Sequence, residues 1–182
     1  MAARGGGGAR GVGARDGVHA PAHTDAKTPP MSARHPNLLE SDAEIAAVAR
    51  AMRVVAVVGM KDESRPWEPA IEIPRMLAGL GVEVIPVNPT IEQALGHRAY
   101  ARLADVPERF DLVDVFRRSE RIPALADEIL ALPAERRPEV VWLQSGIRND
   151  AAALRLAEVG IRVVQDACLG VIAARVRDRR AV

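Results

Sequence analysis

The sequence predicts a single α/β domain with a doubly wound, mainly parallel sheet of five strands and helices on both faces. Within the segment RVVAVVG of residues 53–59, the six residues from Val54 to Gly59 carry no charge and no polar side chain, as in a strand that is buried on both faces of a parallel sheet. Four further strand-like runs follow, with helical patterns between them, and this alternation is typical of parallel strands joined by crossover helices. Hydrophobic residues make up 48% of the chain and aromatic residues only 3%, which suits a core of Val, Leu, Ile and Ala.

The elements are expected in a regular order along the chain. The predicted strands cover residues 53–59, 82–87, 111–116, 139–144 and 161–164. The predicted helices cover residues 42–51, 67–80, 120–132, 149–159 and 169–176, and a short helical piece with a loop is expected over 91–103. Ser41 and Glu44 form a capping box before the first helix. Pro69 suits a first helical turn, whereas Pro74 is expected to kink the helix that contains it.

The two ends of the chain are predicted to lie outside the folded domain, which we place at residues 41–177. Residues 1–34 are rich in Gly, Ala and Arg and have too few large apolar side chains to form a core, so they are predicted to be a disordered tail. A passive extension, or a true start at Met31, is favoured over an Arg/Gly-type nucleic-acid tail. Residues 178–182 are predicted to be a basic C-terminal tail.

Charge and cysteine content exclude several classes of protein. The chain has 25 basic and 24 acidic residues, so its net charge of +1 gives no indication of a nucleic-acid surface. The single cysteine, Cys168, excludes an internal disulfide and fits a reducing compartment. No apolar run reaches membrane-spanning length, and the N-terminus lacks the apolar centre of a secretory signal. We therefore expect a cytoplasmic protein with no membrane or nucleic-acid partner.

The strand ends do not fit a dinucleotide site. NAD sites normally carry G-x-G-x-x-G after the first strand, whereas Gly59 is followed by Lys61 and Ser64 at the positions of the second and third glycines. They also carry an acidic residue at the end of the second strand, where this chain has Asn88 and Pro89. A Walker-type phosphate loop is absent from the sequence as well.

The same positions suit a nucleotide that carries additional phosphate groups. An uncharged Asn88 does not repel phosphate, and Arg117 and Arg118 after the third strand can donate paired hydrogen bonds to phosphate oxygens. Lys61 and Arg65 add positive charge near the start of a helix. Since the carboxyl ends of parallel strands meet at one edge of the sheet, these residues indicate a site for a ligand such as coenzyme A (CoA), which has a pyrophosphate and a 3′-phosphate.

Several segments together resemble a known family. They are residues 55–59, 65–66, 85–89, 111–118 and 141–146, with Asp166 and Cys168, and they occur in this order. The chain is similar to the small single-domain CoA-binding proteins, which are related to the N-terminal domain of the succinyl-CoA ligase α subunit. The resemblance spans about residues 44–176. It implies a Rossmann-like domain that binds CoA or an acyl-CoA. A departure is Ala167, because relatives often have Arg before the cysteine, and this weakens the case for a phosphate contact there.

The residues predicted to bind the cofactor follow the strand ends and the segments of the resemblance. They are Gly59, Met60, Lys61, Arg65, Pro66, Asn88, Pro89, Phe116, Arg117, Arg118, Gln144, Gly146 and Cys168. Cys168 is interpreted either as a small buried residue or as a thiol close to the pantetheine arm of CoA. Trp142 is expected in the core.

The sequence gives no catalytic or metal-binding set of residues. The histidines are His19, His23, His35 and His97, which do not suit the phosphohistidine relay of a succinyl-CoA type ligase. Asp111 and Asp114 are expected on opposite faces of a strand, with a structural or surface role. The sequence therefore favours a non-catalytic or accessory CoA-binding protein. The alternatives are an NAD(P)-dependent oxidoreductase domain and a small subunit of an acyl-CoA ligase. Both a homo-oligomer and an acyl-CoA enzyme remain open as partners.

Overall fold

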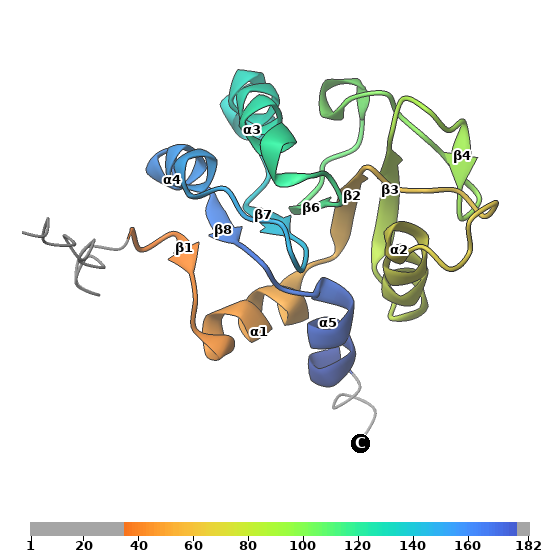
Figure 1. The fold of residues 1–182 in the computed structure, drawn as a ribbon, viewed down its shortest axis with the longest axis horizontal. Coiled ribbons are helices and arrows are strands. Elements are labelled where there is room, and N and C mark those ends of the chain that lie inside the picture. The colour runs from red at the N-terminus through yellow and green to blue at the C-terminus, as the bar shows by residue number, and fades with distance from the viewer. Residues whose placement is uncertain (1–34, 178–182) are drawn as a thin grey trace, which may run out of the picture. The chain divides into compact units, whose positions relative to one another are not determined.

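The computed structural model describes residues 35–177, which form a six-stranded parallel sheet with helices packed on it (Figure 1). The predictions for residues 1–34, including the start at Met31, and for 178–182 lie outside the described residues. The strands of the sheet are β1 (Leu38–Leu39), β2 (Val54–Val58), β3 (Glu83–Val87), β6 (Leu112–Val115), β7 (Val140–Leu143) and β8 (Arg162–Val164). The helices are α1 (Asp42–Ala51), α2 (Pro69–Gly79), α3 (Ile122–Ala131), α4 (Asp150–Glu158) and α5 (Leu169–Arg177).

The predicted fold class is confirmed, since all five predicted strands are present in one parallel sheet with helices on both faces. The capping box is also present, because the Ser41 hydroxyl accepts from the Glu44 N–H at 3.3 Å and donates to the Glu44 carboxylate at 2.5 Å. The α2 helix continues through the buried Pro74. The structure adds the short strand β1, which pairs with β8 at the edge of the sheet. Two residues are too few to show a strand pattern in the sequence.

The helical piece predicted over residues 91–103 is wrong for most of that range. Residues Gln93–Ala94 (β4) and His97–Arg98 (β5) pair as a two-stranded antiparallel hairpin, and only Leu103–Asp105 forms a short 3₁₀ turn. Leu95 and Gly96 make the hairpin turn with positive φ angles of 52° and 77°. Such turns usually contain Asn-Gly or Asp-Gly, and the Leu95-Gly96 pair does not match this sequence pattern, so the hairpin was not predicted.

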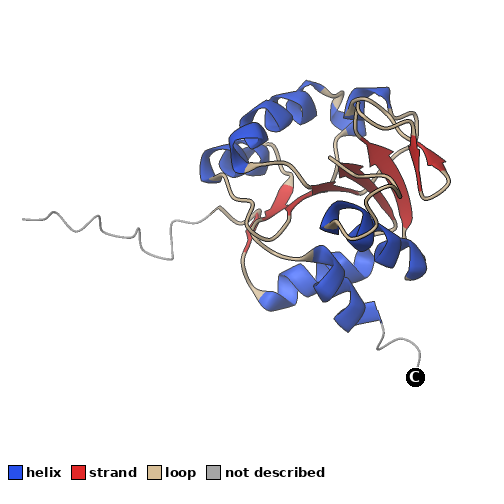
Figure 2. Ribbon diagram, turned by 45° about the vertical axis from the view of Figure 1, so that its right-hand side comes forward, coloured by secondary structure: helices blue, strands red, loops and turns tan. Residues whose placement is uncertain are grey.

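The core is divided between the two faces of the sheet. The residues of alternate strand positions face α3 and α4 on one side and α1, α2 and α5 on the other. Figure 2 shows these helices on both sides of the sheet. Trp142, which was expected in the core, is completely buried in the layer that contains α1, α2 and α5. No helix within residues 35–177 is long and apolar enough to cross a membrane.

The topology identifies the place where a ligand is expected. The strand order is β1-β8-β7-β6-β2-β3, so the chain passes from β2 to β3 on one side and returns to β6 on the other side of β2. The direction of winding therefore changes between β2 and β6. In open α/β sheets, ligands bind beyond the carboxyl ends of the strands at this switch point.

Asp111 has a structural role at the opposite end of these strands. Its Oδ2 accepts from the backbone N–H groups of Arg53 and Val54, both at 3.0 Å. The carboxylate therefore satisfies two donors at the point where β2 begins. This agrees with the role expected for Asp111, and it aligns the start of β2 beside β6.

Candidate functional site

The ends of β2 and β6 approach each other closely at the switch point. The Gly59 N–H donates to Val87 O at 2.8 Å, and the Phe116 N–H donates to Val58 O at 2.9 Å. Gly59 has a φ of +87°, and a Cβ atom at this position would lie 2.8 Å from the carbonyl oxygen of Phe116. A residue with a side chain would therefore be strained and would also clash with the backbone. Glycine is required here by both conformation and space.

A cleft of about 720 Å³ opens at these strand ends, and we call it the switch-point cleft. It is bordered by the β2–α2 connection, the start of α2, the ends of β6 and β7, and the segment before α5. The structure brings together many of the predicted site residues along it: Gly59, Lys61, Phe116, Arg117, Arg118, Gln144, Gly146 and Cys168. The other lining residues were not predicted as site residues from the sequence, and they are Glu68, Pro69, Ala70, Ile73, Ser119, Glu120, Ser145 and Ile147.

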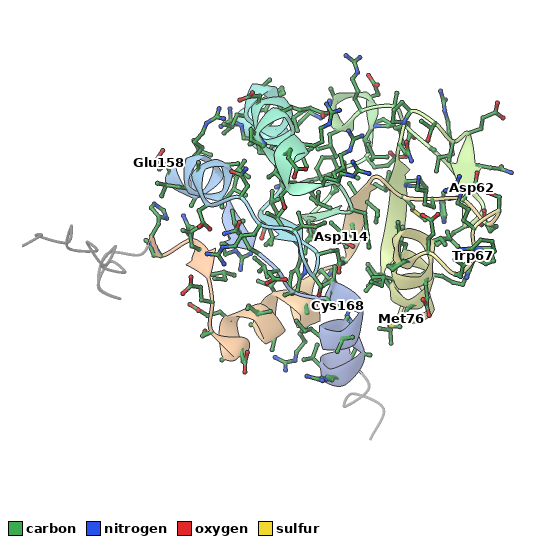
Figure 3. All side chains as sticks on the ribbon, in the orientation of Figure 1. Asp62, Trp67, Met76, Asp114, Glu158 and Cys168 are labelled. Atoms are coloured by element: carbon green, nitrogen blue, oxygen red, sulfur yellow. The ribbon has the colours of Figure 1, made fainter. Side chains whose placement is uncertain are left out.

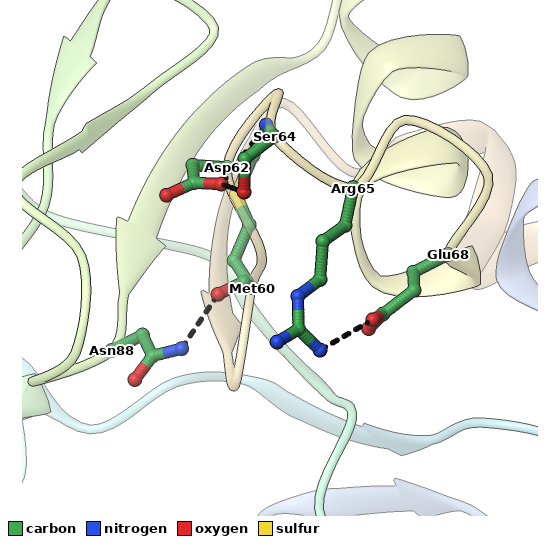
Figure 4. Close-up of polar contacts among 6 residues, drawn as sticks. All are labelled: Met60, Asp62, Ser64, Arg65, Glu68 and Asn88. Carbon is green, nitrogen blue, oxygen red and sulfur yellow. Dashed lines mark hydrogen bonds and ion pairs between the residues drawn. The ribbon is translucent and has the colours of Figure 1, made fainter.

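The cleft carries cations that are available to a ligand. Within residues 35–177, the structure gives Lys61, Arg117 and Arg118 no ion-pair partner. One of the two lining carboxylates, Glu68, is engaged by Arg65 at 3.0 Å (Figure 4). This pair is partly exposed and contributes little to stability, but it offsets the negative charge of Glu68. The balance of charge favours an anionic ligand.

Five of the predicted site residues do not line this cleft. Met60 is completely buried, and its carbonyl accepts from Asn88 Nδ2 at 2.7 Å (Figure 4). Asn88 Oδ1 also accepts from the Thr90 N–H at 3.1 Å. Asn88 thus holds the β2–α2 connection against the end of β3. Together with Pro89 it borders a separate groove of about 580 Å³, while Arg65 and Pro66 are exposed on the connection.

The segment that carries Cys168 is held firmly against the end of β7. Trp142 Nε1 donates to Ala167 O at 2.8 Å, and the Gly146 N–H donates to Asp166 Oδ1 at 2.6 Å. Asp166 has a positive φ of 55°, which turns the chain from β8 toward α5. Cys168 is partly buried at the start of α5 (Figure 3). These contacts position its thiol at the wall of the cleft.

Asp114 has a structural role in the core, which is one of the two roles expected for it, whereas the alternative of a surface position is wrong. Its carboxyl group is completely buried, and Gln144 Nε2 donates to Oδ1 and Oδ2 at 2.8 and 3.0 Å. Burial raises the pKa of Asp114 to about 7, although hydrogen bonds from Gln144 and the Val115 backbone act in the opposite direction. The sequence did contain a signal, because an acidic residue within the apolar strand LVDV between two other buried strands must itself be buried.

The raised pKa makes the free energy of unfolding depend on pH. The folded protein holds the Asp114 proton more tightly than the unfolded chain, in which the carboxyl group has its ordinary pKa of 3.8. The contribution of Asp114 to stability therefore falls as the pH rises from 3.8 to about 7 and is constant above that range.

The parallel doubly wound sheet and its cleft at the switch point define a Rossmann-like α/β domain. Within this class the chain belongs to the family of CoA-binding domains, since the model of the CoA binding domain matches residues 53–174. The match includes all of the residues predicted to bind the cofactor. The family assigned from the sequence segments is therefore confirmed.

Two relatives cover most of the chain. The uncharacterized protein YneT of Bacillus subtilis (strain 168) is 39% identical over 131 residues, which are 72% of this chain and 93% of YneT. A solved structure from Thermus thermophilus is 37% identical, with a TM-score of 0.67, and the match covers 75% of this chain and 99% of that one. The described domain therefore corresponds to nearly the whole of both relatives.

A larger protein shares the fold. Acetyl-coenzyme A synthetase 1 of Ca. Korarchaeum cryptofilum, solved in complex with phosphate and ADP, is 21% identical with a TM-score of 0.54. The match covers 65% of this chain and 27% of the synthetase chain. At this identity the likeness shows the fold alone.

Replacing Gly59 by Ala is expected to lower the free energy of unfolding by more than about 1 kcal/mol, because positive φ and the contact with Phe116 O both oppose a side chain. Urea unfolding measures the change. Gly79→Ala is the matched control, since Gly79 ends α2 with nothing within 4 Å of its added Cβ. The control should be neutral or stabilising by about 0.5 kcal/mol. Equal effects of the two substitutions would contradict the constraint at Gly59.

Proposed function

We propose that the protein binds CoA or an acyl-CoA in the switch-point cleft as a non-catalytic or accessory CoA-binding protein. The observation that carries the proposal is the presence of three cations without ion-pair partners among residues 35–177 at the switch point of a CoA-binding domain. CoA offers a pyrophosphate and a 3′-phosphate to such cations, and guanidinium groups bind phosphate in paired hydrogen bonds. A cleft of about 720 Å³ also lies within the range of small-molecule sites.

The lining of the cleft suits the two chemically different ends of CoA. Lys61, Arg117 and Arg118 provide the positive charge that phosphates require. Ile73, Phe116 and Ile147 provide apolar surface for an adenine ring or the pantetheine arm. Charge and apolar surface together would hold a ligand in the cleft, which supports a binding role.

The proposal also includes where the protein is located and which proteins it acts with. The single thiol of Cys168 in an unpaired state fits a reducing compartment, which supports a cytoplasmic location. A protein of this size could deliver, sequester or sense CoA alone, as a homo-oligomer, or together with an acyl-CoA enzyme. A second chain that remains bound through purification would favour the alternative in which this domain is the small subunit of an acyl-CoA ligase.

Thermal unfolding with a panel of nucleotides tests the proposed ligand. CoA and acetyl-CoA are expected to raise the melting temperature in a concentration-dependent way, whereas NAD, NADP and ATP should have much smaller effects. Fluorescence of Trp67, which is 73% exposed on the β2–α2 connection (Figure 3) and directly precedes the cleft-lining Glu68, provides an independent signal. An effect of NAD without an effect of CoA would contradict the proposal and favour the oxidoreductase alternative.

Arg117→Ala is expected to weaken CoA binding by about tenfold, as loss of a charge-assisted hydrogen bond implies. If Arg117 binds the 3′-phosphate, the affinity for dephospho-CoA should change much less. Isothermal titration with both ligands measures the difference. Arg155→Ala removes an exposed guanidinium that pairs with Asp127 at 2.6 Å outside the cleft, so it should leave both affinities unchanged. Equal losses for CoA and dephospho-CoA in Arg117→Ala would place this arginine elsewhere along the ligand.

Cys168 is proposed to lie close to the thiol end of the bound ligand. Incubation with CoA disulfide should then yield a mixed disulfide, in which the Cys168 thiolate attacks one sulfur and the other CoA leaves as a thiol. Mass spectrometry of the intact chain detects the adduct, and glutathione disulfide at the same concentration is the control. Equal labelling by both disulfides would show that Cys168 is merely accessible and not placed by CoA binding.

A further inference from the structure

A continuous chain of hydrogen bonds runs from the middle of the sheet to the wall of the switch-point cleft. Gln144 Nε2 donates to both carboxyl oxygens of Asp114, and Gln144 Oε1 accepts from the backbone N–H of Leu169 at 3.3 Å. Asp114 is fully buried, and Gln144 is only 4% exposed. Leu169 follows Cys168, which lines the cleft. The buried carboxyl group is thus connected to the first turn of α5.

The orientation of the Gln144 amide depends on whether Asp114 carries a proton. An ionised carboxylate only accepts hydrogen bonds, so it holds Nε2 of Gln144 and leaves Oε1 for the N–H of Leu169. A protonated carboxyl group carries one O–H donor, and Gln144 can accept from it at Oε1 if the amide turns over. The amide then presents Nε2 to the Leu169 N–H, and two donors cannot bond each other. The Leu169 N–H loses its partner in this second arrangement.

We propose that Asp114 and Gln144 form a proton-sensitive positioning pair for the cleft wall at Cys168. With Asp114 ionised, the pair holds the Leu169 N–H and the start of α5. When Asp114 takes up a proton from solvent, this hydrogen bond is released and the first turn of α5 loosens. Asp114 acts through Gln144 and is a positioning residue.

The surroundings of Asp114 support titration near neutral pH. Burial raises its pKa to about 7, and hydrogen bonds from Gln144 and the Val115 backbone oppose this shift. The α1, α2 and α5 helices present apolar side chains to this layer of the core, among them Val48, Ile71, Leu77, Leu169 and Ala173. The charged residues of these helices are exposed at Asp42, Glu44, Arg50, Glu72, Arg75 and Arg175, and Arg177 is half-buried, with its guanidinium bonded to the backbone carbonyls of Ala49, Leu80 and Met52. The titratable or charged residues that line the cleft are Lys61, Glu68, Arg117, Arg118, Glu120 and Cys168. Burial is therefore the main cause of the raised pKa.

The consequence for ligand affinity rests on the proposed function. If CoA occupies the cleft, its affinity should change over the pH range in which Asp114 titrates, and Asp114→Asn should remove this change. The positioning pair itself can be tested in the protein without ligand. Failure of CoA to bind would therefore contradict the proposed function and leave the proton-sensitive pair to be judged separately.

Nuclear magnetic resonance of the full, ligand-free chain tests the pair between about pH 5.5 and 8.5, which brackets neutral titrations. The carboxyl carbon of Asp114, the side-chain amide of Gln144 and the backbone amide of Leu169 should all change with one midpoint. In Asp114→Asn, the change at Leu169 should disappear. Asp111→Asn is the matched control, because Asp111 directly precedes β6 and its carboxylate accepts from the backbone of Arg53 and Val54. This variant should retain the wild-type titration of Asp114, Gln144 and Leu169.

Either of two results would overturn the proposal. One is an Asp114 carboxyl carbon that does not titrate in this range, which the wild-type protein alone reveals even if the variant fails to fold. The other is a Leu169 amide that titrates equally in wild type and Asp114→Asn, because some other group would then be responsible.

Labelling of Cys168 with a maleimide tests whether the proton affects the cleft wall. Cys168 is the only cysteine of the chain, so the reaction reports on this position. Thiol labelling accelerates with pH as the thiolate fraction grows, and this effect cancels in the ratio of the wild-type and Asp114→Asn rates. We expect the ratio to change about fivefold across the titration, the factor that corresponds to one hydrogen bond of average strength. A constant ratio, while Asp114 titrates, would overturn the proposed effect on the cleft.

Discussion

The site depends on the close approach of β2 and β6 at the switch point. Gly59 turns out of β2 with a positive φ, and the carbonyl of Phe116 occupies the space that a Cβ would need. This contact brings the loop with Lys61 and the segment with Arg117 to the same cleft, although 56 positions separate the two residues in the sequence. The glycine therefore serves the packing of two strand ends, and the cations are brought together as a result.

Charge is distributed unequally between the open cleft and the buried layer beneath it. The cations of the cleft are open to solvent, where a charged group without a protein partner costs little. The carboxyl group of Asp114 lies in the core, where burial disfavours the charged form and therefore stabilises the protonated, neutral form. Gln144 belongs to both environments, since it bonds Asp114 and also lines the cleft. A ligand that alters the position of Gln144 would thus be coupled to the proton on Asp114.

The parts of the fold that the sequence predicted well are those with strong local patterns. The apolar runs of the five strands and the capping box before α1 specify their structure within a few residues. The edge strand β1 and the hairpin of β4 and β5 were missed, because a strand of two residues is too short to show alternation of apolar and polar side chains. The hairpin turn at Leu95 also lacks the residue type that usually marks such a turn.

For the site, the sequence alone determined the family and the chemical character of the strand ends. A single glycine and basic residues in place of the dinucleotide pattern are visible without coordinates. Only the tertiary structure decided which of these residues share a cleft: Asn88 bonds the backbone of Met60, whereas Gln144 and Cys168 join Arg117. It also decided that Asp114 is buried beside Gln144. These outcomes depend on which strands are neighbours and which way their side chains point, and both are set by long-range packing.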